Sequence, residues 1–458
     1  MAQACRGDLV SVDVTDLAFG GEGVGRADGY VVFVPGGVPG DRVAVRLQEV
    51  RPRFARGAIE TVETPSAYRV PPPCPYFGRC GGCRLQHVSY EAQLKFKTRQ
   101  VADCLARLGG LGPAQSIPLS PIIGAPEVYG YRNKMEFTFA EVDGQQVVGL
   151  HEAERYDAIL DVERCLLQSD SLNAVLGEVR AFVRERGWSV YRQGSAEGLL
   201  RFLMLREGQA TGECMVNVVT ASPDVAGARA LADRLRARCP QVTSVVLNVN
   251  PKKAAVAVGV EEHPIAGDDT IKERLGDLAF SISANSFFQT NTRQAERLFG
   301  IVTEYAALSG EETVFDLYSG TVAISLILAR RARHVYGIEL VPAAIEDAAR
   351  NARANGIVNC TFLPGEVRHV LPDLMRQGIR ADVVVADPPR AGFHPKALRT
   401  LVALGATRIV YVSCNPATLA RDLQTLVAGG YRPTVVQPVD MFPHTPHIEV
   451  VVRLERSA

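Results

Sequence analysis

The chain has 458 residues, of which 50 are Lys or Arg, 50 are Asp or Glu and 47% are hydrophobic. The length predicts about three domains, and the composition excludes a disordered chain. Because the net charge is zero, overall charge indicates no partner. No apolar run approaches the ~18 residues of a membrane span, so we expect a cytoplasmic protein with no membrane partner. The ten cysteines are too sparse for a disulfide scaffold, and a cluster among them indicates metal or catalysis.

Residues 1–66 are predicted to form a small β-barrel. Its expected strands are 9–17, 30–35, 42–50 and 54–61, with a glycine-rich turn at 19–23. Between Arg42 and Arg56 five arginines accompany a single acid, Glu49. This pattern indicates a local basic face suited to phosphates, and a solvated strand face is the alternative.

Prolines 71–73 indicate a linker, and a central α+β domain is expected over residues 67–308. Three cysteines, Cys74, Cys80 and Cys83, fall in one loop, and Cys165 comes 82 residues later. Four cysteines suit either zinc or an iron–sulfur cluster. This spacing differs from the paired short knuckles of zinc modules, and unliganded cysteines are a third interpretation.

Helices and strands are expected to alternate in the rest of this central domain. The expected helices are 89–108, 169–186 and 222–238, and the expected strands are 134–142, 146–150, 199–206, 212–220 and 242–248. The segment Tyr129 to Lys134 combines aromatic and cationic side chains, which suits splayed single-stranded RNA. An ordinary surface strand has a similar composition.

Residues 309–458 show a regular β-α alternation. The expected strands are short apolar runs at 313–317, 334–339, 360–363, 382–386 and 408–413, with a helix at 342–355. Such runs predict a doubly wound, Rossmann-like parallel sheet with helices on both faces.

In a doubly wound sheet the ligand lies at the carboxyl ends of the strands. Glu339 ends the second strand, 23 residues beyond Asp316, and is placed to bind a ribose diol. The phosphate-binding motif G-x-G-x-x-G is absent, because Gly320 is followed by Val322 and Ala323. S-adenosylmethionine (SAM) has no phosphate, so the pattern favours a methyltransferase. Asp387, before two prolines, is expected to contact a nucleobase or the cofactor, with a simple strand-ending turn as the alternative.

Two more residues indicate the reaction. Cys414 follows the fifth strand, where a nucleophile is expected, although a buried structural cysteine is the alternative. Glu449 precedes three valines and is a candidate general base. A pyrimidine C5 is a poor nucleophile until a thiolate adds to C6. A thiol, a base, a SAM site and a pocket for a flipped base are therefore the set that C5 methylation needs.

At these residues the chain resembles the TRAM-domain RNA uracil-5-methyltransferase family, of the 23S rRNA type with an iron–sulfur cluster, over essentially its whole length. The resemblance implies that Cys414 is the nucleophile, that Glu449 is the base and that RNA is bound through the barrel. It implies six SAM contacts: Gln289, Tyr318, Ala323, Glu339, Glu366 and Asp387. It also implies a [4Fe-4S] cluster on Cys74, Cys80, Cys83 and Cys165. Val322 departs from the glycine that the family usually carries.

Three alternatives stay open at this stage. We expect rRNA as the target, and a tRNA is the alternative. The enzyme is expected to be a monomer. A SAM-dependent N-methyltransferase would use Asp387 and its prolines to hold an exocyclic amine, and Cys414 would be dispensable. A non-catalytic RNA-binding iron–sulfur protein would follow if Val322 abolished SAM binding.

Overall fold

The structure, a computed structural model, describes residues 5–110 and 118–457. The chain divides by its contacts into two compact units. The first contains residues 1–128, 414–424 and 435–450, and the second contains residues 129–413, 425–434 and 451–458. The domain boundaries after residues 66 and 308 stay predictions. No helix among the described residues is long and apolar enough to cross a membrane.

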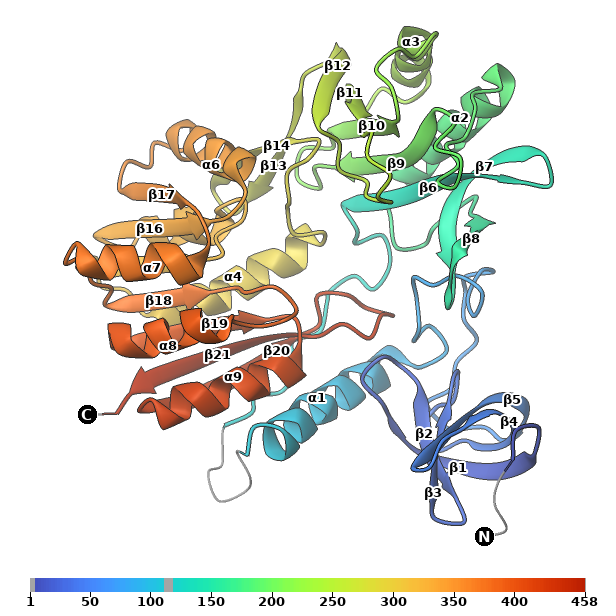
Figure 1. Ribbon diagram of the computed structural model, residues 1–458, viewed down its shortest axis with the longest axis horizontal. Helices are drawn as coiled ribbons and strands as arrows, with labels where there is room; N and C mark the ends of the chain where they lie inside the picture. Colours follow the sequence, from blue (N-terminus) through green and yellow to red (C-terminus); the bar gives the residue numbers. More distant parts are fainter. Residues whose placement is uncertain (1–4, 111–117, 458) are drawn as a thin grey trace. The chain divides into compact units, whose positions relative to one another are not determined.

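The first unit begins with the predicted β-barrel, which is closed (Figure 1). Its strands, in the order β1-β2-β3-β5-β4, are β1 (Leu9–Leu17), β2 (Gly23–Ala27), β3 (Tyr30–Val34), β4 (Arg42–Val50) and β5 (Phe54–Thr64). Strand β2 was not predicted, because its glycines suggested a turn. A Cβ at Gly25 would lie 2.3 Å from the carbonyl oxygen of Asp13 on β1. Gly25 therefore allows the close approach of two strands rather than a bend.

The predicted basic face of the barrel is largely neutralised. Its arginines pair with acids from β5 and from the turn before β2, and with Glu49 of the same stretch. The ion pairs are Arg42–Glu63, Arg46–Glu60, Arg51–Glu49 and Arg56–Glu22. Four of the five arginines thus have a carboxylate partner, which favours the alternative of a solvated strand face at these positions.

Helix α1 (Tyr90–Arg107) follows the cysteine segment in the same unit. Its buried face is partly polar, with Gln93, Lys97 and Gln100 beside apolar residues. These three side chains bind elements on either side of the helix, as described below.

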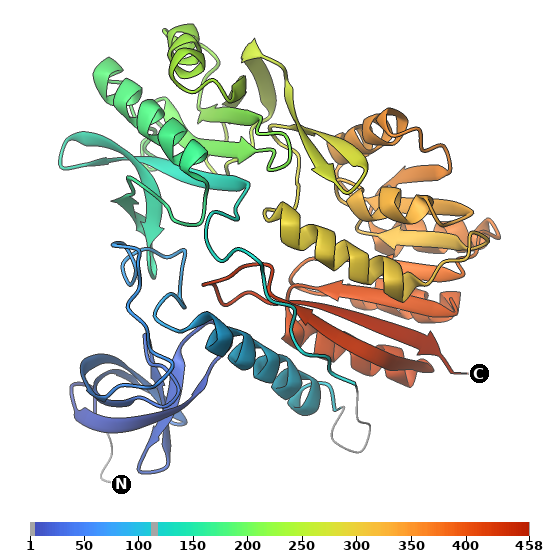
Figure 2. The ribbon, with the colours of Figure 1, turned by 180° about the vertical axis from the view of Figure 1, so that it is seen from behind.

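The second unit contains a seven-stranded mixed sheet in the order β12-β11-β10-β9-β6-β7-β8. Its strands are β6 (Lys134–Val142), β7 (Gln145–Glu152), β8 (Arg155–Asp161), β9 (Leu200–Glu207), β10 (Cys214–Thr220), β11 (Val242–Val249) and β12 (Glu261–Gly267). Helices α2 (Asp170–Arg186) and α3 (Ala228–Arg238) pack on it (Figure 2). The α+β prediction is correct for this region, although β8, β12 and the hairpin β13 (Thr270–Leu275) and β14 (Leu278–Ser283) were not predicted.

The segment Tyr129 to Lys134 is partly buried. Tyr131 is only 1% exposed and Asn133 is 5% exposed. The side chain of Asn133 donates from Nδ2 to the carbonyl oxygen of Gln289 and to Oγ1 of Thr292, both at 2.8 Å. Asn133 therefore fixes the segment around Gln289, and the buried ring of Tyr131 is not available for stacking on RNA bases. Tyr129 is half-buried, and its contact with RNA stays a prediction.

The carboxy-terminal sheet has the order β17-β16-β15-β18-β19-β21-β20. Its strands are β15 (Thr313–Leu317), β16 (His334–Glu339), β17 (Cys360–Pro364), β18 (Val383–Ala386), β19 (Arg408–Ser413), β20 (Tyr431–Val439) and β21 (Glu449–Arg456). Strands β15 to β19 pair in parallel. The chain moves outward from β15 to β17 and returns to β18 on the other side of β15, so the doubly wound prediction is confirmed.

Helices cover both faces of this sheet. They are α4 (Thr292–Ala306), α5 (Ala323–Ala329), α6 (Pro342–Ala354), α7 (Val367–Arg376), α8 (Pro395–Leu404) and α9 (Pro416–Ala428). Helices α7 and α8 cover the face of the sheet that is turned to the viewer in Figure 1. Helix α4 covers the opposite face, which Figure 2 shows. The change of direction beside β15 marks the edge at which a ligand is expected.

Candidate active site

The loop between β15 and α5 has an unusual backbone. Tyr318, Gly320 and Val322 have positive φ angles of 64°, 54° and 63°. Such angles are rare for non-glycine residues and unfavourable for a β-branched one. Val322 is completely buried and its N–H donates to the carbonyl oxygen of Ser319 at 2.8 Å, which holds the turn. Strained non-glycine residues cluster at functional sites.

This loop borders a cavity of about 430 Å³ at the carboxyl ends of β15, β16, β17 and β18. Four of the six predicted SAM contacts line it: Tyr318, Glu339, Glu366 and Asp387. Gln289 and Ala323 do not line it; Ala323 is the buried first residue of α5.

Glu339 is held by the backbone. Its Oε2 accepts a hydrogen bond from the N–H of Gly320 and its Oε1 from the N–H of Val341, both at 2.9 Å. Two donors fix the direction of the carboxylate, and each oxygen retains a lone pair for a further donor. Glu339 therefore has the geometry to accept hydrogen bonds from a ligand diol.

Two further acids make this end of the sheet strongly acidic. Burial raises the pKa of Asp387 to about 7. Burial also raises the pKa of Asp316 to about 7, and the nearby Asp387 and Glu339 carboxylates add to the rise, although Oγ of Ser325 donates to Asp316 at 2.5 Å. Such a site favours a cationic ligand. Asp316 was not among the predicted site residues, and its signal was an acid within an otherwise apolar strand.

The cavity wall also contains Arg368 and His394, which sequence reasoning missed. Arg368 forms an ion pair with Glu366, and its Nη1 lies 3.3 Å from Nε2 of His394. Both residues stand beside helix starts, where charged side chains usually belong to the surface. No sequence pattern distinguishes them from such surface residues.

Cys414 and Glu449 belong to the same compact unit, and strand register relates them. Strand β21 lies next to β19 in the sheet. The N–H of Arg456 donates to the carbonyl oxygen of Thr407 at 3.0 Å, and Arg408 pairs with Glu455 at 3.8 Å. Both contacts fit one antiparallel register.

The same register, followed along both strands, relates the two predicted catalytic residues. Seven residues back from Arg456 is Glu449, and seven residues forward from Thr407 is Cys414. If the ladder continues without a bulge, Cys414 and Glu449 are opposite each other, and directly paired side chains point to the same face of a sheet.

Cys414 also precedes a helix start. The Oδ1 atom of Asn415 accepts a hydrogen bond from the N–H of Ala417 at 3.1 Å, in the first turn of α9. Helix N-termini stabilise negative charge nearby, and thiolates are favoured there. This position is compatible with the predicted role of Cys414 as the nucleophile.

The three cysteines of the amino-terminal loop are half-buried and form no disulfide. The N–H of Gly82 donates to Sγ of Cys80 at 3.4 Å. Burial raises the pKa of Cys80, and the neighbouring Cys74 adds to the rise. Cys165 belongs to the other unit, where its N–H and carbonyl oxygen both bind the side chain of Asn173. Within residues 5–110 and 118–457, no three His, Cys, Asp or Glu side chains are grouped closely enough to hold a metal ion.

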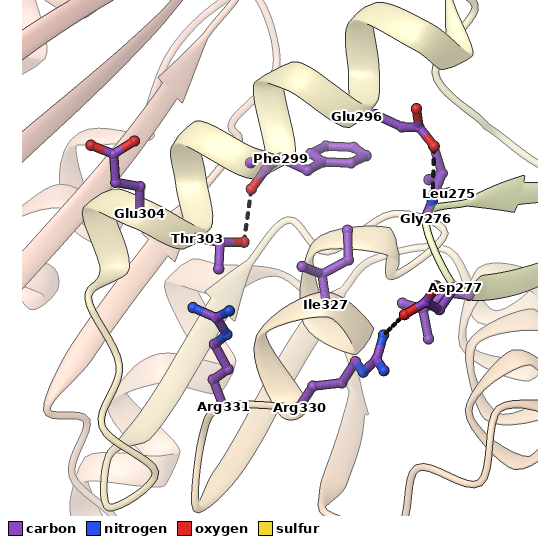
Figure 3. A pocket seen from close by; sticks show the side chains of 12 residues that line it. Leu275, Gly276, Asp277, Glu296, Phe299, Thr303, Glu304, Ile327, Arg330 and Arg331 are labelled. Carbon is purple, nitrogen blue, oxygen red and sulfur yellow. Dashed lines mark hydrogen bonds and ion pairs between the residues drawn. The ribbon is translucent and has the colours of Figure 1, made fainter.

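A second hollow, of about 610 Å³, lies between the β13–β14 turn and helices α4 and α5 (Figure 3). Its lining includes none of the predicted site residues. Three of its charged groups have partners: Arg330 binds Asp277, and Glu296 accepts from the N–H of Gly276. This hollow is not the candidate active site.

Comparison with known proteins identifies the chemistry. A family model described as tRNA (uracil-5-)-methyltransferase matches residues 227–457, and a TRAM domain model matches residues 3–59. The chain belongs to the tRNA (uracil-5-)-methyltransferase family. It is a SAM-dependent RNA uracil-5-methyltransferase with an amino-terminal TRAM domain.

Relatives of this methyltransferase match along its full length. An uncharacterized RNA methyltransferase of Halalkalibacterium halodurans is 42% identical over 450 residues, which are 98% of this chain and 97% of the relative. One of Chlorobaculum tepidum is 43% identical over 473 residues, with 99% and 97% covered. A solved structure, the Pyrococcus abyssi tRNA (uracil-54, C5)-methyltransferase with S-adenosyl-L-homocysteine, is 31% identical. It has a TM-score of 0.77, with 97% of this chain and 99% of that chain covered.

The predicted enzyme class is thereby confirmed. The N-methyltransferase and the non-catalytic alternative are excluded by membership in a uracil-5-methyltransferase family. The roles of individual residues, the iron–sulfur cluster and the target RNA stay predictions.

Proposed function

We propose that this methyltransferase modifies C5 of a uridine in 23S rRNA, with Cys414 as the nucleophile and Glu449 as the base. The proposal is supported by the contacts of Arg456 with Thr407 and of Arg408 with Glu455. Their antiparallel register, continued along β21 and β19, would bring Glu449 opposite Cys414, beside the start of α9. A thiol and a carboxylate on one face of the sheet are the two groups that C5 methylation requires.

In the proposed reaction the Cys414 thiolate adds to C6 of the uracil ring. The electron pair of the C5–C6 double bond moves to C5, which takes the methyl group from the SAM sulfonium and leaves S-adenosylhomocysteine. Glu449 then removes the C5 proton. The electrons of that C–H bond re-form the double bond, and Cys414 leaves C6 as a thiolate.

SAM is proposed to occupy the cavity beside β15. Its ribose diol would donate to Glu339, whose carboxylate two backbone N–H groups already orient. Its positive charges suit the acidic surroundings made by Asp316 and Asp387. Tyr318 and Glu366 line the same cavity, whereas Gln289 and Ala323 are proposed contacts on the family resemblance alone.

We also propose that Cys74, Cys80, Cys83 and Cys165 hold a [4Fe-4S] cluster. The donor chemistry fits, because none of the four cysteines forms a disulfide and Cys80 already accepts an N–H···S hydrogen bond. When bound, the cluster supplies cross-links that stabilise a loop with little apolar content. The four cysteines have no part in methyl transfer.

A tRNA is the second candidate target. The Pyrococcus abyssi relative is described as a methyltransferase of uracil 54 in tRNA, and the matching family is likewise described as acting on tRNA. Mass-spectrometric mapping of 5-methyluridine in 23S rRNA and in tRNA from a deletion strain decides between them. Loss of the mark from rRNA alone supports the proposal, and loss from tRNA alone contradicts it.

Substitutions test the catalytic pair. Cys414→Ala is expected to bind SAM in calorimetry but to give no methyl transfer and no covalent complex with 5-fluorouridine RNA. Glu449→Gln is expected to form the covalent complex with unmodified RNA and to stall there, so that a protein–RNA species accumulates on denaturing gels. Turnover by Cys414→Ala would exclude covalent catalysis, and normal turnover by Glu449→Gln would exclude this base.

A further inference from the structure

The segment 440–448, between β20 and β21, leads directly into Glu449 and has no helix or strand of its own. Its conformation must therefore be set by contacts with other parts of the chain. His444 in this segment has a φ of 65°, a left-handed angle that persists only where surrounding contacts hold it. Those contacts come from helix α1 and from the residues that follow Cys83.

Lys97 of α1 holds the first part of the segment. Its Nζ donates to Oδ1 of Asp440 at 2.6 Å and to the carbonyl oxygen of Phe442 at 3.3 Å. Lys97 is 1% exposed and Asp440 is fully buried. A buried ion pair contributes little net stability compared with an apolar pair, so fixing the geometry is the better explanation for it.

Gln93, one turn earlier on α1, holds the middle of the segment. Its Oε1 accepts from the N–H of His444 at 3.0 Å, and its Nε2 lies 3.1 Å from Nδ1 of the same residue. The carbonyl oxygen of His444 accepts from the N–H groups of Arg84 and Leu85 at 2.9 and 3.0 Å. Both main-chain polar groups of His444 are thus fixed, five residues before Glu449.

We propose that Gln93 and Lys97 are positioning residues that set the place of the Glu449 carboxylate for removal of the C5 proton. This rests on the proposed role of Glu449 as the base. Because Arg84 follows Cys83 directly, the same contacts connect the cysteine loop with the segment before Glu449. A displacement of about 1 Å at a reacting group costs up to roughly 100-fold in rate, so a released segment should slow proton removal specifically.

Helix α1 offers a matched control. Gln100 is also a buried glutamine of α1, but its Nε2 donates to the carbonyl oxygens of Leu17 and Ala18 in the barrel, at 2.8 and 3.1 Å. Gln93→Leu and Gln100→Leu remove the same group from the same helix. Only Gln93→Leu releases the segment before Glu449.

The test uses the full-length enzyme, tritiated SAM and total RNA from a deletion strain. Gln93→Leu is expected to lower kcat about 10- to 100-fold, with unchanged SAM affinity in calorimetry and a covalent protein–RNA species on denaturing gels. Gln100→Leu is expected to show neither change in kcat nor accumulation. Wild-type kcat for Gln93→Leu, or equal losses for the two variants, would overturn the positioning role.

Two further variants keep the outcome decisive. Should Gln93→Leu fail to fold, Lys97→Met with Asp440→Asn removes the ion pair without leaving a buried charge, and the same accumulation is expected. Glu449→Gln separates a failure of the base assignment from a failure of the positioning role. Normal turnover by Glu449→Gln means that the base assignment is wrong, whereas a stalled Glu449→Gln with a normal Gln93→Leu means that only the positioning role is wrong.

Discussion

Asp387 is a residue of the cavity whose charge changes near neutral pH. Its pKa is raised to about 7 by burial, so the carboxyl group is largely neutral at pH 6 and largely ionised at pH 8. A bound sulfonium favours the ionised form. Binding of SAM and loss of the Asp387 proton are therefore coupled.

We expect the SAM affinity to rise about tenfold between pH 6 and pH 8, because the ionised form must be present for tight binding. Calorimetry across this range measures the change. In Asp387→Asn the affinity should be lower and should depend less on pH than in the wild type. A flat wild-type profile would contradict the assignment of this cavity to SAM.

Two buried histidines make the first unit sensitive to acid. Burial lowers the pKa of both His87 and His444 to about 4, and the nearby Arg69 and Lys97, respectively, lower it further. In the unfolded chain their pKa is about 6.5. The folded state therefore binds fewer protons between these values, so stability is fully present above pH 6.5 and is lost as the pH falls towards 4.

Each histidine is expected to contribute a loss of roughly 3 kcal/mol over that range. In His87→Phe, the difference in unfolding free energy between pH 7.5 and pH 4.5 should shrink by about 2–3 kcal/mol. Denaturant unfolding at the two pH values measures it. The exposed His369→Gln serves as a control that should behave like the wild type, and an unchanged difference in His87→Phe would refute the expectation.

At the scale of single elements, Val322 shows two opposing effects. It begins α5 with a left-handed backbone that costs an L-residue about 1–2 kcal/mol. Its side chain is fully buried, which stabilises the fold by roughly 1.5–3 kcal/mol. The sequence alone showed only that a glycine was replaced, and the burial explains why valine is tolerated.

Val322→Ala is expected to lose about 1.6 kcal/mol of burial, at ~0.8 kcal/mol per methylene, while the backbone strain stays. Val322→Gly loses slightly more burial but relieves the strain. We therefore expect Val322→Gly to be at least as stable as Val322→Ala in denaturant unfolding. A glycine variant more than about 1 kcal/mol less stable would show that the loop is not strained.

The elements that periodicity predicted well are those with apolar runs. Strands β1, β4, β15, β16 and β19 begin and end at the predicted residues. Strand β2 was missed because Gly25 serves interstrand contact, a role that composition does not distinguish from a turn. Tyr131 was misassigned because buried and RNA-facing aromatic residues share one local pattern.

At the scale of the whole molecule, contacts between distant segments limited the prediction of the site. Asp387 and Glu339 were predictable because each ends a strand. The contact of Lys97 with Asp440 joins residues 343 positions apart, and no local pattern identifies it. The acids that pair with the barrel arginines likewise come from other strands.

The cysteine loop provides the last prediction, which concerns stability, RNA binding and SAM binding together. The loop around Cys80 has no helix or strand and few apolar side chains, so the proposed cluster must supply much of its folding free energy. Cys80→Ser should therefore lose iron and the brown colour of anaerobically purified protein. It should become protease-sensitive between Pro73 and Cys83 and bind RNA more weakly. SAM affinity should persist in the same full-length variant, because the cavity beside β15 contains no residue of the loop.

A matched control is Cys104→Ser, at a half-buried cysteine of α1 outside the proposed ligand set, which should retain its iron. Stoichiometric zinc without iron in protein never exposed to oxygen, or full iron content in Cys80→Ser, would refute the iron–sulfur assignment.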